Sequence, residues 1–559
     1  MLRPASWTKA PSGERWRNDV VATLWSATLA AAVIGPMAGK GWVVLLDWVT
    51  GPRVRFADRI LAGDALPAGP AFFGLAAAMH GLFGAAVGWL VPAVSLTAAG
   101  IGAARLAGTA VTSTVARLTA STAYVWNPFV HERLYAGQLA VLLGYAVLPF
   151  VFTAAIENVG PVGPPGPPGT DASFGRSRRR GVLLVGITWA VATAASIHFA
   201  VLGAIVVGST AVAEWIVTRR ETLRWLAAVV AVTGVVSAAW LLPRVSHAPP
   251  TGDKRTIEAF ATRPDPTLGL AGGVAVQRGF WRPSPGDPSP DLEWWWLLGV
   301  GALGGAALVG LSSMWRGGGR RLVIAVGLVG TIGWLLGQGG DGVMGLLYRS
   351  LTDVPGLRVM REAGKFIALV SLLWAVGLAG AVELLQNRWR GRVGRRAGAF
   401  VGLACALLPV LLTPGLAAGV GGRLAAVRYP NEWSVLADEL TAHPRGAVIV
   451  LPFTAYFDPG FTGGRVVRST ARAYFGPRVI ASDDSGIAGL PVSARTRAIA
   501  SALASSDPGP ELAARGVGWL VGVADPSPVH GSSFVAVTTR RGWALYRNMA
   551  FGNDQRQHR

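Results

Sequence analysis

The feature that most constrains this chain is the recurrence of apolar windows close to twenty residues long that carry almost no charge. A window of this length crosses the hydrocarbon core of a bilayer as a helix, because the helix satisfies its own backbone hydrogen bonds. We therefore predict an α-helical polytopic membrane protein with about eleven transmembrane helices. The windows fall at roughly 19–38, 87–104, 108–125, 137–156, 181–197, 199–217, 225–242, 294–314, 321–337, 366–386 and 397–416. Residues 70–85 form either a further span or a helix that lies in the membrane interface.

Composition supports this class of protein. Only 14% of the 559 residues are charged, whereas soluble domains carry about 25%. The net charge of +21 could indicate a nucleic-acid partner, but the arginines gather in short connections between apolar windows, where they set topology. We therefore expect a membrane protein with no nucleic-acid partner. The single cysteine, Cys405, lies in an apolar window, which excludes a disulfide framework and a cysteine metal site.

The basic connections also predict the orientation of the chain. If the N-terminus lies inside, the inside connections contain short, strongly basic stretches, as the positive-inside rule requires. These stretches are "RSRRR" (176–180), "TRRETLR" (218–224), "RGGGRR" (316–321) and "RWRGRVGRR" (388–396). The N-terminal segment has no convincing small-residue cleavage site, so we expect an anchor and not a removed signal peptide. We expect a multi-pass protein of the plasma membrane with a cytoplasmic N-terminus.

The composition changes near residue 421. Buried-strand patterns appear at 446–453, 516–525 and 543–548, and "SARTRAIASALAS" and "PELAARG" are typical of helices. We therefore predict two domains, a transmembrane domain at 1–420 and a small α/β domain at 421–559. Eleven spans would place the second domain on the outer face.

The sequence contains no motif typical of a soluble enzyme. GxxxxGK[ST], HExxH and GxSxG are absent, and the seven histidines do not cluster at metal-ligand spacing. The candidates for chemistry are polar residues on the outer side, at membrane depth.

The first candidate is Asp47 in "GWVVLLDWVTGPRVRF". A carboxylate among apolar and aromatic neighbours is costly unless it is paired, and its pKa should rise. A raised pKa suits a general base that acts on a hydroxyl. The alternative is an interfacial aspartate paired with Arg53 or Arg55.

The second candidate is the turn "YVWNPFVHERLYAGQ" (124–138), which contains His131, Glu132 and Arg133. This stretch is either a polar site or a simple connection between two helices. In the second case Glu132 would lie in the first turn of a helix, where the helix dipole favours a carboxylate. His198 in "ASIHFA" marks a tight outer turn between two spans, and a structural histidine is the simpler interpretation there.

The third candidate is "PGLRVMREAGKF" (355–366), which leads into a late span. On a helix, Arg358, Arg361 and Lys365 would share one face, and Glu362 would be the i,i+4 partner of Arg358. Cations can simply extend toward water at the end of a span. However, the positive-inside rule and the helix dipole both disfavour cations at this position. We therefore expect an anionic partner, and a phosphate suits the planar arginine fork.

Three stretches together carry a resemblance to a known family: "LLDWVTGPR", "NPFVHERLYAGQ" and "PGLRVMREAGKF", followed by an outer soluble domain. The chain resembles the GT-C superfamily of membrane glycosyltransferases. More narrowly, it is similar to an actinobacterial membrane-protein group related to the amino-terminal region of the large mycobacterial arabinofuranosyltransferases. The resemblance covers most of residues 19–386.

The resemblance implies transfer of a sugar from a polyprenyl-phosphate donor to a glycan or lipid acceptor of the cell envelope, on the outer face. By position Asp47 would be the base, and Arg358, Arg361 and Lys365 would bind the donor phosphate. Residues that would orient the substrate are His131, Glu132, Arg133, His198 and Glu362.

The chain departs from the family in its first outer loop. Many relatives have paired acidic residues there, often with a metal, whereas Asp47 stands alone and the next acids are Asp58 and Asp64. The cofactor is therefore left open, since a divalent cation would have no clear ligand set. Two other functions also stay open. One is a lipid or solute transporter, although transporters often show two related halves. The other is a non-catalytic scaffold on a glycosyltransferase fold.

Overall fold

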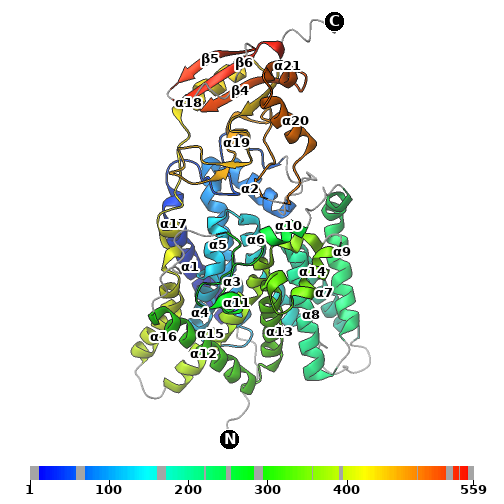
Figure 1. Ribbon diagram of the computed structural model, residues 1–559. Helices are drawn as coiled ribbons and strands as arrows, with labels where there is room; N and C mark the ends of the chain where they lie inside the picture. The colour runs from blue at the N-terminus through cyan, green and yellow to red at the C-terminus, as the bar shows by residue number, and fades with distance from the viewer. Residues whose placement is uncertain are drawn as a thin grey trace.

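A computed structural model provides the three-dimensional structure of the chain. It describes residues 12–57, 69–159, 171–219, 222–246, 254–282, 294–354, 357–389, 395–487, 489–523, 533–540 and 542–551. A helical bundle occupies one end of the molecule, and a smaller region of helices and strands lies at the other end (Figure 1).

Every predicted apolar window overlaps one of the bundle helices for most of its length. These are α1 (Ser12–Ile34), α3 (Val87–Ala107), α4 (Thr114–Val125), α6 (Leu139–Asn158), α7 (Asp171–Ala195), α8 (His198–Thr218), α9 (Leu223–Ser246), α12 (Trp294–Arg316), α13 (Arg320–Gly337), α15 (Ile367–Trp389) and α16 (Arg395–Leu412). Eight helices among the described residues are long and apolar enough to cross a membrane, or up to nine if one bent pair is counted. The multi-pass architecture is therefore confirmed, while the predicted count of eleven is not. For example, α4 has only 12 residues.

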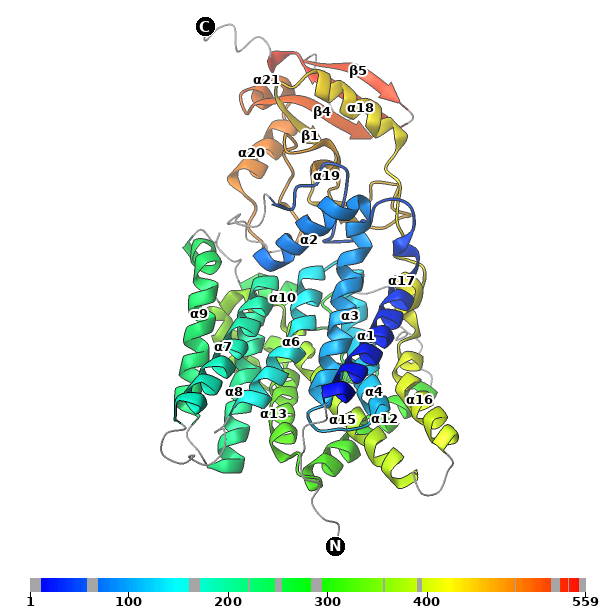
Figure 2. The same ribbon diagram turned by 180° about the vertical axis from the view of Figure 1, so that it is seen from behind.

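Residues 70–85 continue directly into the next predicted span. Helix α2 (Pro70–Phe83) and the short η3 (Gly84–Ala86) run into α3 as one stretch of 38 residues. A straight helix of that length would measure roughly 57 Å, against a hydrocarbon core of about 30 Å. The stretch therefore reaches beyond a single crossing, and α2 lies at the end of the bundle below the C-terminal region (Figure 2).

Close helix packing occurs where small residues face each other. Gly310 on α12 and Gly377 on α15 approach so closely that a Cβ at either one would overlap the backbone of the other helix. Small residues at a crossing allow this approach in membranes, where van der Waals packing drives helix association. Helices α6 and α15 form the centre of the bundle, since 78% and 72% of their apolar windows are buried.

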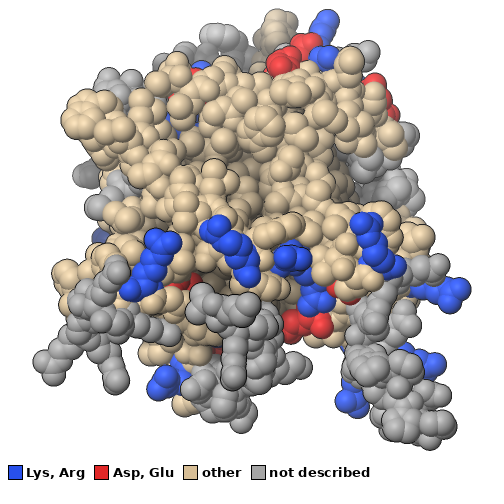
Figure 3. Space-filling view, turned by 90° about the horizontal axis from the view of Figure 1, so that it is seen from below, with Lys and Arg blue, Asp and Glu red and all other residues tan. Residues whose placement is uncertain are grey.

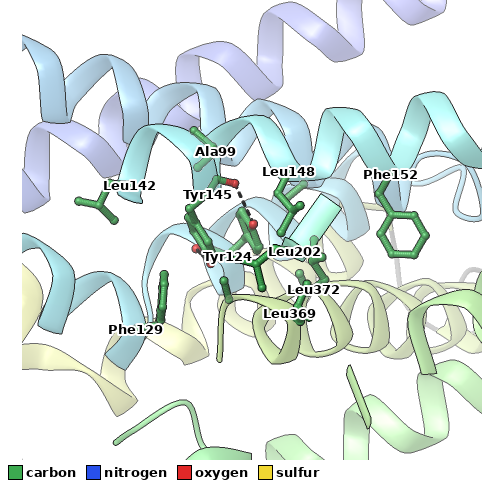
Figure 4. Packing of buried hydrophobic residues seen from close by; sticks show 14 of the residues in the cluster. Ala99, Tyr124, Phe129, Leu142, Tyr145, Leu148, Phe152, Leu202, Leu369 and Leu372 are labelled. Carbon is green, nitrogen blue, oxygen red and sulfur yellow. Dashed lines mark hydrogen bonds between the residues drawn. The ribbon is translucent and has the colours of Figure 1, made fainter. Parts of the chain in front are cut away.

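A pair of tyrosines joins α4 to α6 in the core (Figure 4). The rings of Tyr124 and Tyr145 stack with centroids 4.0 Å apart, and each hydroxyl donates to the carbonyl of the other residue, at 3.0 and 2.8 Å. The amide of Asn127 donates to the Tyr145 hydroxyl, and its side-chain oxygen caps α5 (Pro128–Tyr135) by accepting from the backbone of Val130. This contact fixes where α5 begins.

The C-terminal region contains a four-stranded sheet in the order β1-β4-β6-β5. Strands β1 (Ala447–Val450) and β4 (Val517–Val523) are parallel, and β6 (Trp543–Asn548) is antiparallel to both β4 and β5 (Phe534–Arg540). The three predicted strands are therefore confirmed as β1, β4 and β6, whereas β5 was not predicted. A separate two-stranded ribbon pairs β2 (Tyr456–Phe457) with β3 (Val467–Arg468).

Helices cover both faces of this sheet, which explains the uninterrupted apolar pattern of β1. Val448 and Val450 pack with α18 (Asn431–Ala442) on one face. Ile449 lies in the opposite core, which includes residues of α20 (Ala494–Leu503) and α21 (Pro508–Ala513). The small C-terminal α/β region is therefore confirmed.

The shorter elements are the helices α10 (Lys254–Ala259), α11 (Gly269–Ala275), α14 (Gly345–Asp353), α17 (Ala417–Gly421) and α19 (Ala471–Phe475), and the 3₁₀ turns η1 (Gly35–Ala38), η4 (Gly339–Asp341), η5 (Leu357–Arg361), η6 (Ala363–Phe366) and η7 (Pro414–Leu416).

The end of the bundle away from the C-terminal region carries many cations (Figure 3). The ends of α12 and α13 that meet in a basic connection lie far from the C-terminal region (Figure 1). Figure 3, seen from that end, shows several Lys and Arg side chains and few carboxylates. This is the distribution expected of a cytoplasmic face.

Candidate active site

The first connection of the chain folds into a tight turn with Asp47 near its tip. Val44 and Val49 form an antiparallel bridge, and the backbone N–H of Leu45 donates to the carbonyl of Trp48 at 2.7 Å. The turn is seated on the residues that follow α5, because the N–H of Asp47 donates to the carbonyl of Ala136 at 3.0 Å.

Gly137 makes this seating feasible. Its φ of +68° lies in the left-handed region, and a Cβ at this position would come within 2.8 Å of the Trp48 nitrogen. The glycine in "LYAGQ" is therefore required by the close approach of the Asp47 turn. Two of the three stretches that carry the family resemblance thus meet in space.

The C-terminal region completes the surroundings of Asp47. The hydroxyl of Tyr456, on β2, donates to Oδ1 of Asp47 at 2.7 Å, across 409 positions of sequence. The neighbouring strand β3 is attached to the same turn, because the N–H of Arg468 donates to the carbonyl of Leu46 at 2.9 Å. The sequence analysis missed both residues, since no local pattern links two segments so far apart.

Burial raises the pKa of the Asp47 carboxyl above its ordinary value. The hydrogen bond from Tyr456 and the charges of Arg468, Lys365 and Arg282 act in the opposite direction. Of the two alternative partners considered, Arg53 instead donates to the carbonyl of Phe475 and to Thr441, at 3.5 and 3.3 Å.

The approach to α15 is not the regular helix that we predicted. It consists of η5 and η6, and Glu362 between them has φ −91° and ψ 92°. The prediction that Arg358, Arg361 and Lys365 share one helical face is therefore wrong. The side chain of Arg358 lies outside the described residues.

Glu362 is the centre of a buried charge network. One carboxylate oxygen pairs with Arg133, and the other accepts from Nζ of Lys365 at 2.9 Å. Lys365 also donates to Nε2 of His198 at 2.8 Å, and Nδ1 of His198 lies 2.9 Å from the hydroxyl of Ser196. The structure thus brings together four predicted site residues from three segments of the chain.

The contact between Lys365 and His198 restricts the protonation state of the histidine. With Lys365 as an ammonium group, which can only donate, Nε2 of His198 accepts and its Nδ1–H donates to Ser196. The histidine is then neutral, and the network contains two cations and one carboxylate. One positive charge remains, and Lys365 is close enough to Asp47 for the two charges to interact.

Arg133 is fully buried between two aromatic rings. Its guanidinium carbon lies 5.1 Å from the ring centroid of Phe129 and 4.8 Å from that of Phe280. Nη1 also donates to Gln138 at 2.7 Å. Burial lowers the pKa of Arg133 to about 10, so the group remains charged at neutral pH.

The neighbours of Arg133 in the sequence have different roles. Oε1 of Glu132 accepts from the backbone N–H groups of Gly279 and Phe280, both at 3.3 Å, and so holds that loop. His131 is buried, and burial lowers its pKa to about 4. No hydrogen bond joins the His131 side chain to the Glu362 network within the described residues.

Arg361 is more exposed than Lys365, the other predicted phosphate ligand whose side chain the structure describes. Its guanidinium stacks on Phe260, 5.1 Å from the ring centroid. It forms no hydrogen bond or ion pair with the described part of the chain, in contrast to Lys365. Among the described residues, no group of three or more His, Cys, Asp or Glu side chains is arranged to hold a metal ion.

Comparisons with known proteins identify the fold. No family model and no characterised protein sequence matches this chain. Among solved structures, the chain is similar to the arabinofuranosyltransferase AftD from Mycobacteria, with a TM-score of 0.61 and 17% identity over 97% of this chain and 40% of AftD. A mutant of AftD gives a TM-score of 0.60, 18% identity and coverage of 97% and 42%. The apo structure of ArnT from Cupriavidus metallidurans gives 0.50 and 13%, with coverage of 97% and 99%.

These structures are GT-C-fold membrane glycosyltransferases, and the resemblance predicted from the sequence is confirmed at the level of the fold. The chain spans about 40% of the length of AftD.

The buried network predicts a large effect of removing its carboxylate. Glu362→Gln leaves Arg133 and Lys365 buried without a counter-charge, and breaking a buried pair costs about 3–5 kcal/mol. We expect a clear loss of thermal stability of the purified protein in detergent. Glu439→Gln is the control, because Glu439 forms an exposed pair with His443, and such pairs contribute about 0–1 kcal/mol. Equal melting temperatures for Glu362→Gln and the parent would refute the structural role of this network.

Proposed function

We propose that the chain is a membrane glycosyltransferase that uses a polyprenyl-phosphate-linked sugar as donor. The observation that carries this proposal is the Asp47 carboxylate, which accepts from Tyr456 and lies in the field of Lys365, Arg282 and Arg468. A carboxylate with a raised pKa is suited to accept a proton, and nearby cations are suited to stabilise a departing phosphate. The GT-C fold is consistent with this chemistry.

The reaction needs one proton transfer and one bond exchange. The acceptor hydroxyl oxygen attacks the anomeric carbon of the donor sugar while its proton passes to the Asp47 carboxylate. The bond between the anomeric carbon and the phosphate oxygen breaks, and the electron pair stays on the polyprenyl phosphate. The products are the glycosylated acceptor and a lipid phosphate with one more negative charge, which the cations stabilise.

Arg361 is the most direct candidate for holding the phosphate. It forms no hydrogen bond or ion pair within the described residues, and stacking on Phe260 orients its planar fork. Lys365 is tied to Glu362 and His198, so it would act through its charge in the proposed site. Arg358 remains a candidate from the sequence alone.

We further propose that the site faces the outside of the plasma membrane. The basic end of the bundle in Figure 3 suits the cytoplasm, which would put Asp47 and the C-terminal region on the outer face. We retain the predicted division into a transmembrane domain at 1–420 and an extracytoplasmic domain at 421–559. A lipid donor would account for a polar cluster at the boundary of the bundle.

The assignment of the base predicts the behaviour of Asp47→Asn. This variant should lose transfer of a labelled sugar from polyprenyl-phosphate donors while it still binds the donor, because the amide cannot accept the proton. The measurement is product formation by purified protein, together with donor binding. Asp353→Asn, at the exposed end of α14, is the matched control. If Asp47→Asn transferred sugar as fast as the parent, Asp47 would not be the base.

The hydrogen bond from Tyr456 predicts a shift in the pH profile. The base must be ionised, so the rate falls as the pH drops through the pKa of Asp47. Tyr456→Phe removes a donor that favours the carboxylate, which raises this pKa and moves the acid limb of the profile to higher pH. The shift should reach about one to two pH units, since a hydrogen bond to a charged group contributes about 1.5–3 kcal/mol. Tyr474→Phe should leave the limb in place. An unchanged limb in Tyr456→Phe would contradict the assignment.

The phosphate site predicts weaker donor binding in Arg361→Ala. Loss of a charged hydrogen bond should reduce the affinity for a polyprenyl-phosphate-linked sugar by about 1–3 kcal/mol. Titration of the donor into purified protein measures this change. Arg349→Ala removes an exposed arginine from the nearby helix α14 and should bind the donor like the parent. Equal affinity in Arg361→Ala and the parent would exclude Arg361 from the phosphate site.

A further inference from the structure

A cleft of about 610 Å³ opens next to the Asp47 turn. Its volume lies within the range typical of small-molecule binding sites. Five separate parts of the chain contribute to its walls, so the cleft exists only in the assembled fold. The lining residues are Leu45–Leu46, Tyr135, Arg282, Gly422–Ala425 with Val427, and Phe461–Val467.

The lining of the cleft is strongly cationic. It contains three arginines, Arg282, Arg423 and Arg465, and none of its residues is Asp or Glu. The side chains of Arg282 and Arg423 form no hydrogen bond or ion pair with the described part of the chain. Two carboxylates outside the lining interact with these arginines through their charges. Asp47 acts on Arg282, and Asp458 acts on Arg465.

One of these arginines is held in a fixed position. Nε of Arg465 donates to the carbonyl of Thr462 at 2.8 Å, and Nη1 donates to the carbonyl of Val44 at 3.2 Å. Two of the three guanidinium nitrogens are thus engaged by the backbone. Nη2 has no hydrogen-bond partner among the described residues. The fork is therefore oriented in advance, which reduces the entropy lost when it binds an anion.

The rest of the lining suits a sugar. Tyr135 and Phe461 contribute aromatic rings, and Phe461 is supported by Tyr429, whose ring centroid lies 5.1 Å away. Gly463 and Gly464 have φ of +69° and +76°, and a Cβ at either would meet no atom within 4 Å. These glycines expose backbone groups at the wall of the cleft, where a ligand can approach them closely.

The position of the cleft separates it from the proposed phosphate site. None of its lining residues comes from 357–366, which contains Arg361 and Lys365. Arg282 lines the cleft and also acts on Asp47, whereas Lys365 acts on Asp47 from the bundle. Cations from the cleft and from the bundle therefore both act on Asp47, as expected if two anionic substrates meet at one base.

We propose that this cleft binds the acceptor, and that the acceptor is a glycan carrying a carboxylate or phosphate group. This inference rests on the proposed glycosyltransferase function and adds the chemical class of the second substrate. The guanidinium of Arg423 and Nη2 of Arg465 bind the anionic group through charge-assisted hydrogen bonds. The sugar stacks against the aromatic wall and presents a hydroxyl toward Asp47.

Binding of a matched pair of probes tests the proposal without turnover. The probes are α-1,4-trigalacturonate and its neutral trimethyl ester, which share one sugar skeleton and differ in charge. Isothermal titration calorimetry on the full chain in detergent measures the affinity of each. The variants are Arg423→Gln, Arg423→Gln with Arg465→Gln, and the control Arg540→Gln, which makes the same charge change on the exposed strand β5.

We expect trigalacturonate to bind the parent and Arg540→Gln equally. Its affinity should fall about fivefold in Arg423→Gln and more than tenfold in the double variant, with the neutral ester weak throughout. Since Arg423 is exposed and forms no hydrogen bond or ion pair with described residues, Arg423→Gln should fold normally, and an unchanged melting temperature verifies this.

Two results would overturn the proposal. One is trigalacturonate affinity that is the same in the parent and the double variant. The other is Arg423-dependent binding of dihexanoyl phosphatidylglycerol in place of the glycan, which would assign the cleft to a lipid. Both results are independent of sugar transfer. A chain that binds trigalacturonate through Arg423 but transfers no sugar would retain the cleft assignment and refute the enzymatic one.

Discussion

The pairing of the Glu362 carboxylate with two buried cations is the interaction on which the rest of the site depends. It is buried at the start of α15, where it binds Arg133 from α5 and Lys365 from its own segment. Removing ions from water costs several kcal/mol each, and only close pairing offsets that cost. The three groups must therefore stay together in the folded state. Through Lys365 the network also reaches His198 at the start of α8, so it joins α5, α8 and the segment that leads into α15.

This arrangement divides the cations near Asp47 into two groups. Arg133 and Lys365 are neutralised in part by Glu362, whereas Arg361, Arg282 and Arg423 have no ion-pair partner within the described residues. Asp47 is held by Tyr456 from the C-terminal region and lies in the field of Lys365 and Arg282. The bundle and the C-terminal region therefore both contribute to the proposed site, and neither could form it alone.

Much of the fold could be predicted because the relevant signals are local. Apolar windows marked the bundle helices, and the run of apolar residues at 446–453 marked a strand covered on both faces. The stretches around Asp47, Arg133 and Lys365 were recognised as unusual because polar groups at membrane depth need partners. The prediction of one helical face at 358–365 was wrong. It assumed regular helical spacing, whereas the helical conformation is interrupted at Glu362, the residue that pairs with Arg133.

The sequence by itself determined the class of this protein, the bundle helices and the strands β1, β4 and β6. It also identified the polar residues that are candidates for catalysis and binding. Hydropathy and charge act over distances of one helix turn to one bilayer thickness, and a linear pattern records them directly. Only the tertiary structure decided which of these residues meet. The hydrogen bond from Tyr456 to Asp47 spans 409 positions, and the arginine-lined cleft is built from five segments. Such contacts depend on how the packed elements are placed in space. No periodic pattern or fixed spacing in the sequence records that placement.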